Sequence, residues 1–144
     1  MKFLLDTNVF VHLGNQSRGW VGIAQRIRAV GIEQCAMSAM SAYELRYLLL
    51  RGPGRIKREN IERLSAAFAS VRQVLPITGA VAEKAAILRV DLQAQGLDIG
   101  LPDCVIAAQA LGAGLSCVTA NRKHFDRING LAVEDWSSAA YQPV

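Results

Sequence analysis

Short apolar runs alternate with longer segments of helical periodicity along this chain of 144 residues, and this alternation restricts the fold most. The runs that predict strands are residues 1–6, 33–37, 73–77, 115–119 and, as a short fifth, 131–133. Pro76 lies within the third run, which favours an edge position or the end of a strand. Strands that alternate with helices are typical of a mostly parallel sheet covered by helices on both faces. We therefore predict one α/β domain with a mostly parallel central sheet of four or five strands.

The segments between these runs carry apolar side chains at helical spacing, as amphipathic helices do. Three of the stripes are Ile23, Ile27 and Val30, ended by Gly31; Ile61, Leu64, Phe68 and Val71; and Val81, Ala85, Leu88 and Leu92, capped by Thr78 and ended by Gly96. Residues 41–50 form a strongly apolar helix that ends in the turn 51–54, and residues 102–113 are almost wholly apolar. The last helix is therefore expected in the core.

Composition restricts the class of protein further. The chain is 51% hydrophobic and 19% charged, which excludes a disordered tail protein. No apolar stretch approaches the ~18 residues of a membrane span, and the start is too short for a signal peptide, so we expect a cytoplasmic protein. Cys35, Cys104 and Cys117 are widely spaced and odd in number, which predicts buried thiols in a reducing compartment. A net charge of +4 and a pI near 9.3 suit a polyanionic partner.

Several polar residues stand where predicted strands end or apolar helices begin, and each has a purely structural interpretation. Asp6 could cap a helix that begins near Thr7. Glu44 follows Ser41 at the spacing of a capping box. Asp103 lies at a helix start, where the helix dipole favours negative charge. Asn121, which follows the fourth run, is an ordinary loop residue by type.

Considered together, the three acids Asp6, Glu44 and Asp103 favour a different interpretation. Carboxylates held against a core without partners are costly, and carboxylates brought into one crevice raise one another's pKa values. A divalent cation removes that repulsion, and hard oxygen ligands suit Mg²⁺ or Mn²⁺. The chain lacks the set of thiolates and imidazoles that zinc prefers. The sequence thus predicts that these three acids form a site for Mg²⁺ or Mn²⁺.

Four motifs in order carry a resemblance to a known family. They are Leu4-Leu5-Asp6-Thr7-Asn8; Ser41-Ala42-Tyr43-Glu44-Leu45; Gly100-Leu101-Pro102-Asp103 with Ile106-Ala107-Ala108; and Val118-Thr119-Ala120-Asn121 with His124-Phe125. With these motifs the chain resembles the PIN-domain ribonucleases, and more narrowly the VapC-type toxins of bacterial type II toxin–antitoxin pairs. The resemblance extends from Leu4 to Trp136 and implies a single PIN-like domain over residues 1–144.

The resemblance implies a role for each matched position. Asp6, Glu44 and Asp103 match the three principal acids of the family, and Asn121 stands where many relatives carry a fourth acid. Asp6 and Asp103 are expected to bind Mg²⁺ (or Mn²⁺) directly or through water, and Glu44 to orient the attacking water. His124 occupies a variable position, so no catalytic role is assigned to it.

Further residues are predicted to contact the substrate or a partner. Thr7 and Asn8 fit polar positions that support a water or a phosphate oxygen, and Arg122 and Lys123, with Arg127, lie beside Asn121 where they can hold phosphates. A second basic cluster comprises Arg51, Arg55, Lys57 and Arg58. A helix surface with Tyr43, Tyr47 and Leu48 to Leu50 is more apolar than one core needs, which favours a homodimer unless both faces are buried within the monomer.

The function implied is that of a metal-dependent endoribonuclease toxin that leaves a 3′-hydroxyl and a 5′-phosphate. The resemblance implies RNA as the substrate and a VapB-type antitoxin as the inhibitor. Gly130-Leu131 and Glu134-Asp135-Trp136 are similar to the end of the enteric members of the family, which points to transfer RNA. Two alternatives stay open: a catalytically inactive PIN-fold module that binds RNA or protein, and a structure-specific DNA nuclease. A receiver domain fits poorly because the late strand ends in Thr119, and a haloacid-dehalogenase-type phosphatase needs an acid where Asn8 stands.

Overall fold

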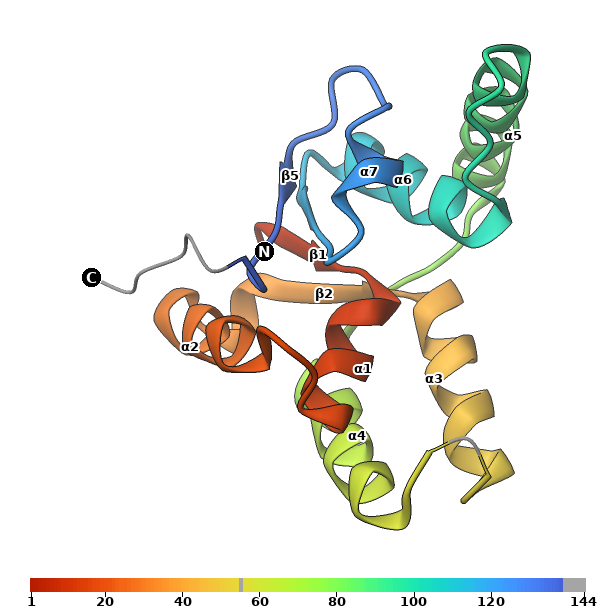
Figure 1. Cartoon of the computed structure of the whole chain (residues 1–144). Helices are drawn as coiled ribbons and strands as arrows, with labels where there is room; N and C mark the ends of the chain where they lie inside the picture. The colour runs from red at the N-terminus through yellow and green to blue at the C-terminus, as the bar shows by residue number, and fades with distance from the viewer. Residues whose placement is uncertain (55, 139–144) are drawn as a thin grey trace.

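Five parallel strands form the central sheet of the computed structural model, which describes residues 1–54 and 56–138 (Figure 1). The strands are β1 (Phe3–Leu5), β2 (Cys35–Ser38), β3 (Gln73–Leu75), β4 (Ser116–Val118) and β5 (Val133–Glu134). Their order across the sheet is β3-β2-β1-β4-β5, and every neighbouring pair is parallel. The predicted α/β fold with a parallel sheet is confirmed.

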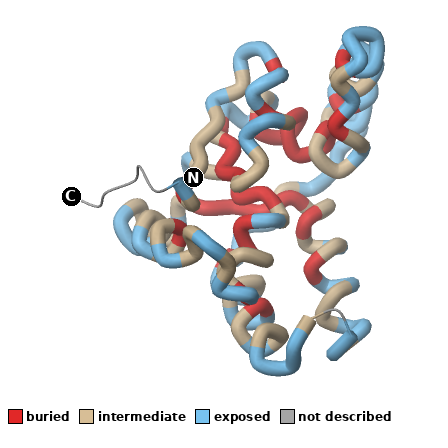
Figure 2. Tube along the Cα trace, viewed as in Figure 1, coloured by how far each residue is buried: buried red, intermediate tan, exposed pale blue. Residues whose placement is uncertain are grey.

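Helices cover both faces of this sheet. One face carries α1 (Thr7–Asn15), α2 (Trp20–Val30), α3 (Ala39–Arg51) and α4 (Arg58–Ser70). The other carries α5 (Gly79–Ala94), α6 (Leu101–Ala113) and α7 (Arg122–Phe125). In Figure 1 the two groups lie below and above the strands, and Figure 2 shows that the buried residues concentrate along the sheet and the inner sides of these helices.

The alternation of side chains along the strands explains why two separate cores form. Leu4 pairs with Ala36 and Cys117 in register, and all three belong to the core under α5, α6 and α7. Leu5 pairs with Met37 and Val118, which belong to the core under α1 to α4. Because successive side chains of a strand point to opposite faces, each of the three central strands contributes to both cores.

The burial of the cysteines and the predicted helix stripes are confirmed, except that Val71 lies just beyond α4, which ends at Ser70. Leu64 and Val71 are buried on one face of the sheet, and Ala85 and Leu92 on the other. The residues of α6 from Cys104 to Ala110 are all buried. All three cysteines are buried and free. No helix within the described residues is long and apolar enough to cross a membrane.

Several element boundaries differ from the sequence prediction. Residues 32–34 form a short 3₁₀ turn, η1 (Ile32–Gln34), so β2 begins at Cys35. Strand β3 ends before Pro76, which has no N–H to donate to a neighbouring strand. The fifth strand occupies Val133–Glu134, because pairing with β4 rather than apolar character fixes its position.

The strand order places a crevice at one edge of the sheet. From β1 the chain runs outward to β2 and β3 on one side, and it later returns to β4 on the other side of β1. The helices after β1 and β2 therefore cover one face and those after β3 and β4 cover the other. In open α/β sheets, ligands bind beyond the carboxyl ends of the strands at such a reversal point, here between β1 and β4. Asp6 directly follows β1, and Thr119 directly follows β4.

Candidate active site at the carboxyl edge of the sheet

Asp6 lies at the centre of this edge, and the capping role that the sequence offered for it is confirmed. It is the N-cap of α1, and its Oδ1 accepts a hydrogen bond from the Thr7 N–H at 2.7 Å. Its Oδ2 accepts a second bond from the Thr119 hydroxyl at 2.9 Å. The side chain is only 2% exposed. Capping therefore fixes the orientation of a carboxylate that is also buried at the point where the two central strands end.

Glu44 reaches the same place from α3. The Thr7 hydroxyl donates to Glu44 Oε1 at 3.1 Å and lies 2.8 Å from the hydroxyl of Ser41. Ser41 and Glu44 are three residues apart, so they share one face of the helix, and that face points to Thr7. Glu44 is thus connected to the residue next to Asp6.

The capping-box interpretation of Ser41 and Glu44 is wrong. Helix α3 begins at Ala39, two residues earlier than predicted, and its N-cap is Ser38, whose hydroxyl accepts from the Met40 N–H at 3.0 Å. Ser41 is fully buried inside the first turn. The helix begins early because Ser38 ends β2 and can cap at once, which leaves the Ser41 hydroxyl free to contact Thr7.

Asp103 comes from the opposite group of helices, in the first turn of α6. Pro102 precedes it at the start of the helix, where a missing N–H costs no hydrogen bond. Asp103 Oδ2 lies 2.7 Å from Nδ1 of His124, the histidine of α7. The Asp103 side chain is 20% exposed, so it lines the crevice rather than the core.

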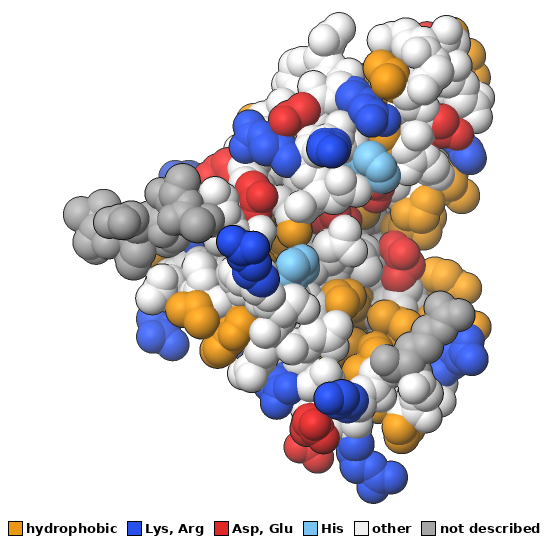
Figure 3. All heavy atoms as spheres, viewed as in Figure 1, with side chains coloured by type: hydrophobic (Ala, Val, Ile, Leu, Met, Phe, Trp, Pro, Cys, Tyr) orange, Lys and Arg blue, Asp and Glu red, His pale blue; other side chains and the backbone are white. Residues whose placement is uncertain are grey.

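The three acids form one electrostatic cluster. Burial, together with the charges of Asp103 and Glu44, raises the pKa of Asp6 from 3.8 to about 7, although the bonds from Thr119 and Thr7 oppose the change. Burial also raises the pKa of Glu44, and Asp103 adds to it against the bond from Thr7. Figure 3 shows acidic side chains in the hollow between the upper and lower groups of helices. Negative charge is therefore concentrated where the sequence predicted it.

The donor set of this cluster suits a hard divalent cation, since it consists of carboxylates whose repulsion a cation would relieve. Within residues 1–54 and 56–138, no three His, Cys, Asp or Glu side chains converge closely enough to hold a metal directly. A cage of three carboxylates is thus not preformed. That Asp6 and Asp103 bind the cation and that Glu44 orients a water therefore stays a prediction. Mg²⁺ usually retains several waters when only one or two carboxylates bind it.

Asn121 and the predicted substrate contacts lie around the same edge. Asn121 is the N-cap of α7, and its backbone N–H donates to Thr119 Oγ1 at 2.9 Å. Asn8 is exposed in the first turn of α1. Arg122 and Lys123 are exposed on α7, and Arg122 forms an ion pair with Asp126 at 3.0 Å. The helix that follows Asn121 thus exposes two basic side chains to solvent.

The other charged residues lie elsewhere. Arg51, Lys57 and Arg58 flank the turn after α3, and Arg55 lies outside the described residues. Asp98 is exposed in the loop between α5 and α6. Hydrogen bonds from the Gly100 N–H and from Gln93 and Arg89 lower its pKa to about 2.

Sequence reasoning missed the contacts of Thr119 and His124 with the acids, and the contact of Ser41 with Thr7. Thr119 carried a usable signal, because it ends the strand that would be expected beside β1. Ser41 was assigned to the wrong turn of its helix. His124 gave no signal, because its contact joins α6 and α7 across 21 positions of the sequence.

Comparison with known proteins identifies the family of this chain. Residues 3–131 match the model of the PIN domain family. The tRNA(fMet)-specific endonuclease VapC of Shigella flexneri is 32% identical over 140 residues, which are 95% of this chain and 99% of that protein. The ribonuclease VapC2 of Rickettsia felis is 29% identical over 136 residues, covering 94% and 98% of the two chains.

Solved structures give the same result for the fold. A chain of VapBC2 from Rickettsia felis, bound to a DNA fragment from its promoter, superposes with a TM-score of 0.78 at 26% identity, covering 94% of this chain and 99% of the other. A chain of DNA-bound VapBC from Salmonella typhimurium gives a TM-score of 0.76 at 27% identity, covering 94% and 98%. With its acids at the carboxyl edge of a parallel sheet and relatives of matching length, this chain belongs to the PIN-domain family and, within it, to the VapC proteins.

Proposed function

We propose that this protein is the toxin of a toxin–antitoxin pair, a metal-dependent endoribonuclease that a VapB-type antitoxin neutralises. The observation that carries the proposal is the buried Asp6, whose pKa is raised by burial and by the charges of Asp103 and Glu44. A protein gains no stability by placing three acids this way, so a function that uses their charge explains them best. The named ribonuclease and endonuclease relatives support the choice of RNA as substrate.

Each residue of the site has a proposed role in phosphodiester hydrolysis. Asp6 and Asp103 would hold Mg²⁺ or Mn²⁺, which when bound lowers the pKa of the attacking water and draws charge from the phosphate oxygens. Glu44, whose Oε1 accepts from the Thr7 hydroxyl, would orient the water and accept its proton. Asn121 borders the cluster, and Thr7 and Asn8 offer polar groups to a water or phosphate oxygen. Arg122 and Lys123 offset the charge of the RNA backbone.

Transfer RNA is the substrate class that we propose. The relatives from Shigella flexneri and Salmonella typhimurium are both named as tRNA(fMet)-specific endonucleases. Only 6% of the residues here are aromatic, so a platform that stacks unpaired bases has few side chains to use. Recognition of a folded RNA by its shape and backbone fits this composition better.

The exposed surface of α3 is the proposed contact for a second copy of the chain. Tyr43, Tyr47 and Leu50 are 66%, 49% and 77% exposed, and the two tyrosine rings stack with centroids 6.2 Å apart. Leu48 and Leu49 instead pack against the core, so the surface is narrower than the sequence suggested. Exposed apolar surface of this kind marks interaction sites in soluble proteins.

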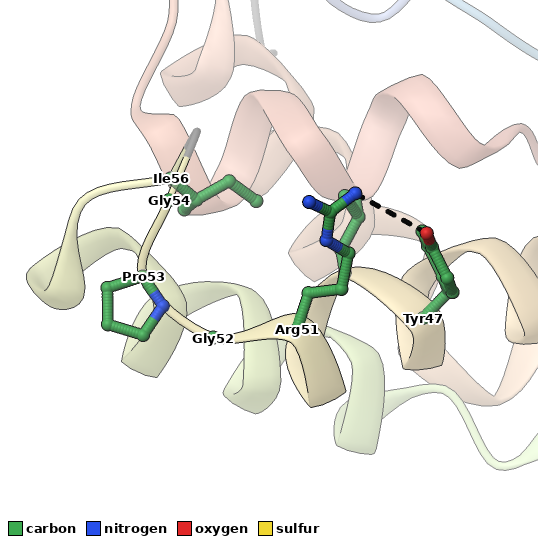
Figure 4. A pocket seen from close by; sticks show the side chains of 7 residues that line it. Tyr47, Arg51, Gly52, Pro53, Gly54 and Ile56 are labelled. Atoms are coloured by element: carbon green, nitrogen blue, oxygen red, sulfur yellow. Dashed lines mark hydrogen bonds between the residues drawn. The ribbon is translucent and has the colours of Figure 1, made fainter.

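A cavity of about 200 Å³ continues this surface at the end of α3 (Figure 4). It is lined by Tyr47, Leu48, Arg51, Gly52, Pro53, Gly54 and Ile56. Arg51 spans its rim, where Nη1 donates to the Tyr47 hydroxyl at 3.4 Å. The cavity lies at the far end of α3 from Glu44, so we assign it to protein contacts and not to catalysis.

The decisive experiment is cleavage of a pool of transfer RNA by the purified chain, with Mg²⁺ and with EDTA, followed by sequencing of the RNA ends. We expect discrete cuts that leave a 3′-hydroxyl and a 5′-phosphate and that disappear with EDTA. Asp6→Asn should abolish them, because it removes the central charge at nearly constant shape. Asp91→Asn, a change of an exposed acid on α5, serves as the matched control and should cleave normally.

Other results would favour the remaining alternatives. Cleavage of branched or nicked DNA in preference to RNA would identify a structure-specific DNA nuclease. Metal-independent binding of RNA without any cleavage, unaffected by Asp6→Asn, would identify an inactive binding module. Full ribonuclease activity in the Asp6→Asn protein would contradict the assignment of the site.

A further inference from the structure

The contact between Asp103 and His124 is a close interaction of the acidic cluster to which the proposed function assigns no role. Asp103 Oδ2 and His124 Nδ1 are 2.7 Å apart, at the short end for a hydrogen bond. Asp103 lies on α6 and His124 on α7, the helices that precede and follow β4 along the chain. The side chains are 20% and 34% exposed, so the contact lies at the wall of the crevice and not in the core.

Helix α7 holds His124 in place by connections on both sides. Phe125, the next residue, is fully buried in the core under α6. On the other side, the backbone N–H of His124 donates to Asn121 O at 3.3 Å, and the Asn121 N–H donates to Thr119 Oγ1. Thr119 in turn donates to Asp6. The imidazole is therefore fixed relative to both Asp103 and Asp6.

The chemistry of the pair sets the direction of the bond. An ionised carboxylate can only accept, so a hydrogen bond at this distance requires that Nδ1 carries the proton. We assign this tautomer from the geometry, since ring protons are inferred rather than seen. Within the described residues, the second oxygen of Asp103, Oδ1, accepts no hydrogen bond. One oxygen is thus held and the other is left available.

We propose that His124 is a positioning residue for the metal site: its Nδ1–H holds one oxygen of Asp103 so that the other is presented to the cation. The proposal rests on the metal site that the proposed function assigns to Asp6 and Asp103, but it does not depend on the cleavage of RNA. Groups that hold the ligands of a metal commonly change its affinity by about ten-fold to a hundred-fold. His124 would act through Asp103 and would not itself touch the cation.

A purely structural role for the contact makes a different prediction. If His124 only docked α7 against α6, its loss would lower thermal stability and leave the cation affinity of the folded protein unchanged. If His124 positions Asp103, its loss should lower the cation affinity and leave the thermal stability nearly unchanged. Phe125 already anchors α7 in the core, so the loss would affect only the orientation of the Asp103 carboxylate. Affinity for a cation therefore separates the two roles where activity alone would not.

The test is calorimetric titration of Mn²⁺ into the folded wild type, His124→Ala, His124→Asn and His124→Gln. Asparagine carries its amide nitrogen at the same number of bonds from Cα as Nδ1, whereas glutamine places its own at the position of Nε2. We expect His124→Ala and His124→Gln to bind Mn²⁺ about ten-fold more weakly, with His124→Asn restoring most of the affinity. Asn129→Ala, an exposed change just beyond α7, is the matched control and should bind as the wild type does.

A second readout needs no metal. Long-range ¹H–¹⁵N NMR of the metal-free protein should report that His124 carries its proton on Nδ1 in the wild type. A proton on Nε2 alone would overturn the proposal, as would equal Mn²⁺ affinity in the wild type and His124→Ala, or rescue by glutamine instead of asparagine. A wild type that binds no Mn²⁺ would overturn it as well.

The two proposals can fail separately. If the wild type binds Mn²⁺, the variants rank as expected and no RNA is cleaved, the ribonuclease assignment fails while the role of His124 stands. If RNA is cleaved with unchanged kcat and KM by His124→Ala and its Mn²⁺ affinity is unchanged, the ribonuclease assignment stands and the role of His124 fails.

Discussion

Asp6 combines at one residue a contribution to folding and a contribution to the site. Its carboxylate caps α1 and accepts from Thr119, which stabilises the fold, yet its burial beside Asp103 and Glu44 raises its pKa to about 7. Burying a charge among like charges opposes folding. The fold therefore tolerates a destabilising charge at the position where the proposed chemistry needs it.

This conflict predicts an unusual dependence of stability on pH. A raised pKa means that the folded state binds the Asp6 proton more tightly than the unfolded chain does. The contribution of this residue to stability is then fully present below about pH 4 and is lost as the pH rises through about 7. We therefore expect the free energy of unfolding of the wild type, measured with urea in EDTA and taken relative to that of Asp6→Asn, to be smaller at about pH 8 than at about pH 5. The difference should amount to about 1–3 kcal/mol. Parallel pH profiles of the two proteins would contradict this account.

Among the elements, α1 and α4 cross at a close approach that a glycine permits. A Cβ placed on Gly14 of α1 would lie 2.9 Å from Cβ of Leu64, and Leu64 is buried in the core. Arg63 adds a bond from Nε to the Gly14 carbonyl at 2.9 Å. The position of α1, which Asp6 caps at its other end, thus depends on the absence of a side chain at Gly14.

We predict that Gly14→Ala destabilises the protein by about 1–3 kcal/mol, because the backbones of α1 and α4 must separate to accept the methyl group. Gly112→Ala is the matched control: a Cβ added at this position of α6 would meet nothing within 4 Å, and alanine is the better helix former. Urea unfolding of both variants measures the effect. A Gly14→Ala protein as stable as Gly112→Ala would contradict the tight crossing.

At the scale of the whole molecule, the strand order decides both where the site lies and which surface remains for a partner. The reversal at β1 gathers Asp6, Glu44 and Asp103 at one edge of the sheet, supplied by helices from both faces. Helix α3 begins at that edge and runs away from it, so its exposed residues Tyr43, Tyr47 and Leu50 extend from beside the site to the cavity at its end.

We predict that the free protein is a dimer and that Leu50→Asp converts it to a monomer. Leu50 is 77% exposed, so the substitution should leave the fold of the monomer intact while placing a charge in an apolar contact. Light scattering coupled to size-exclusion chromatography measures the mass. Ile87→Asp, at an apolar residue of α5 that is 56% exposed, is the control and should stay dimeric. A monomeric wild type, or a monomer produced equally by both variants, would exclude α3 as the dimer surface.

The amino-acid sequence by itself determined the layered parallel sheet, the stripes of the helices and the identity of the three acids. These features are local: a strand or helix is specified by side-chain periodicity, and Asp6 is recognisable because it ends an apolar run. Only the tertiary structure decided which partners each acid has. Thr119 donates to Asp6 because β4 pairs with β1, and His124 reaches Asp103 because α6 and α7 pack on the same core. Those contacts join residues 113 and 21 positions apart, and no local pattern encodes a distance that chain packing sets.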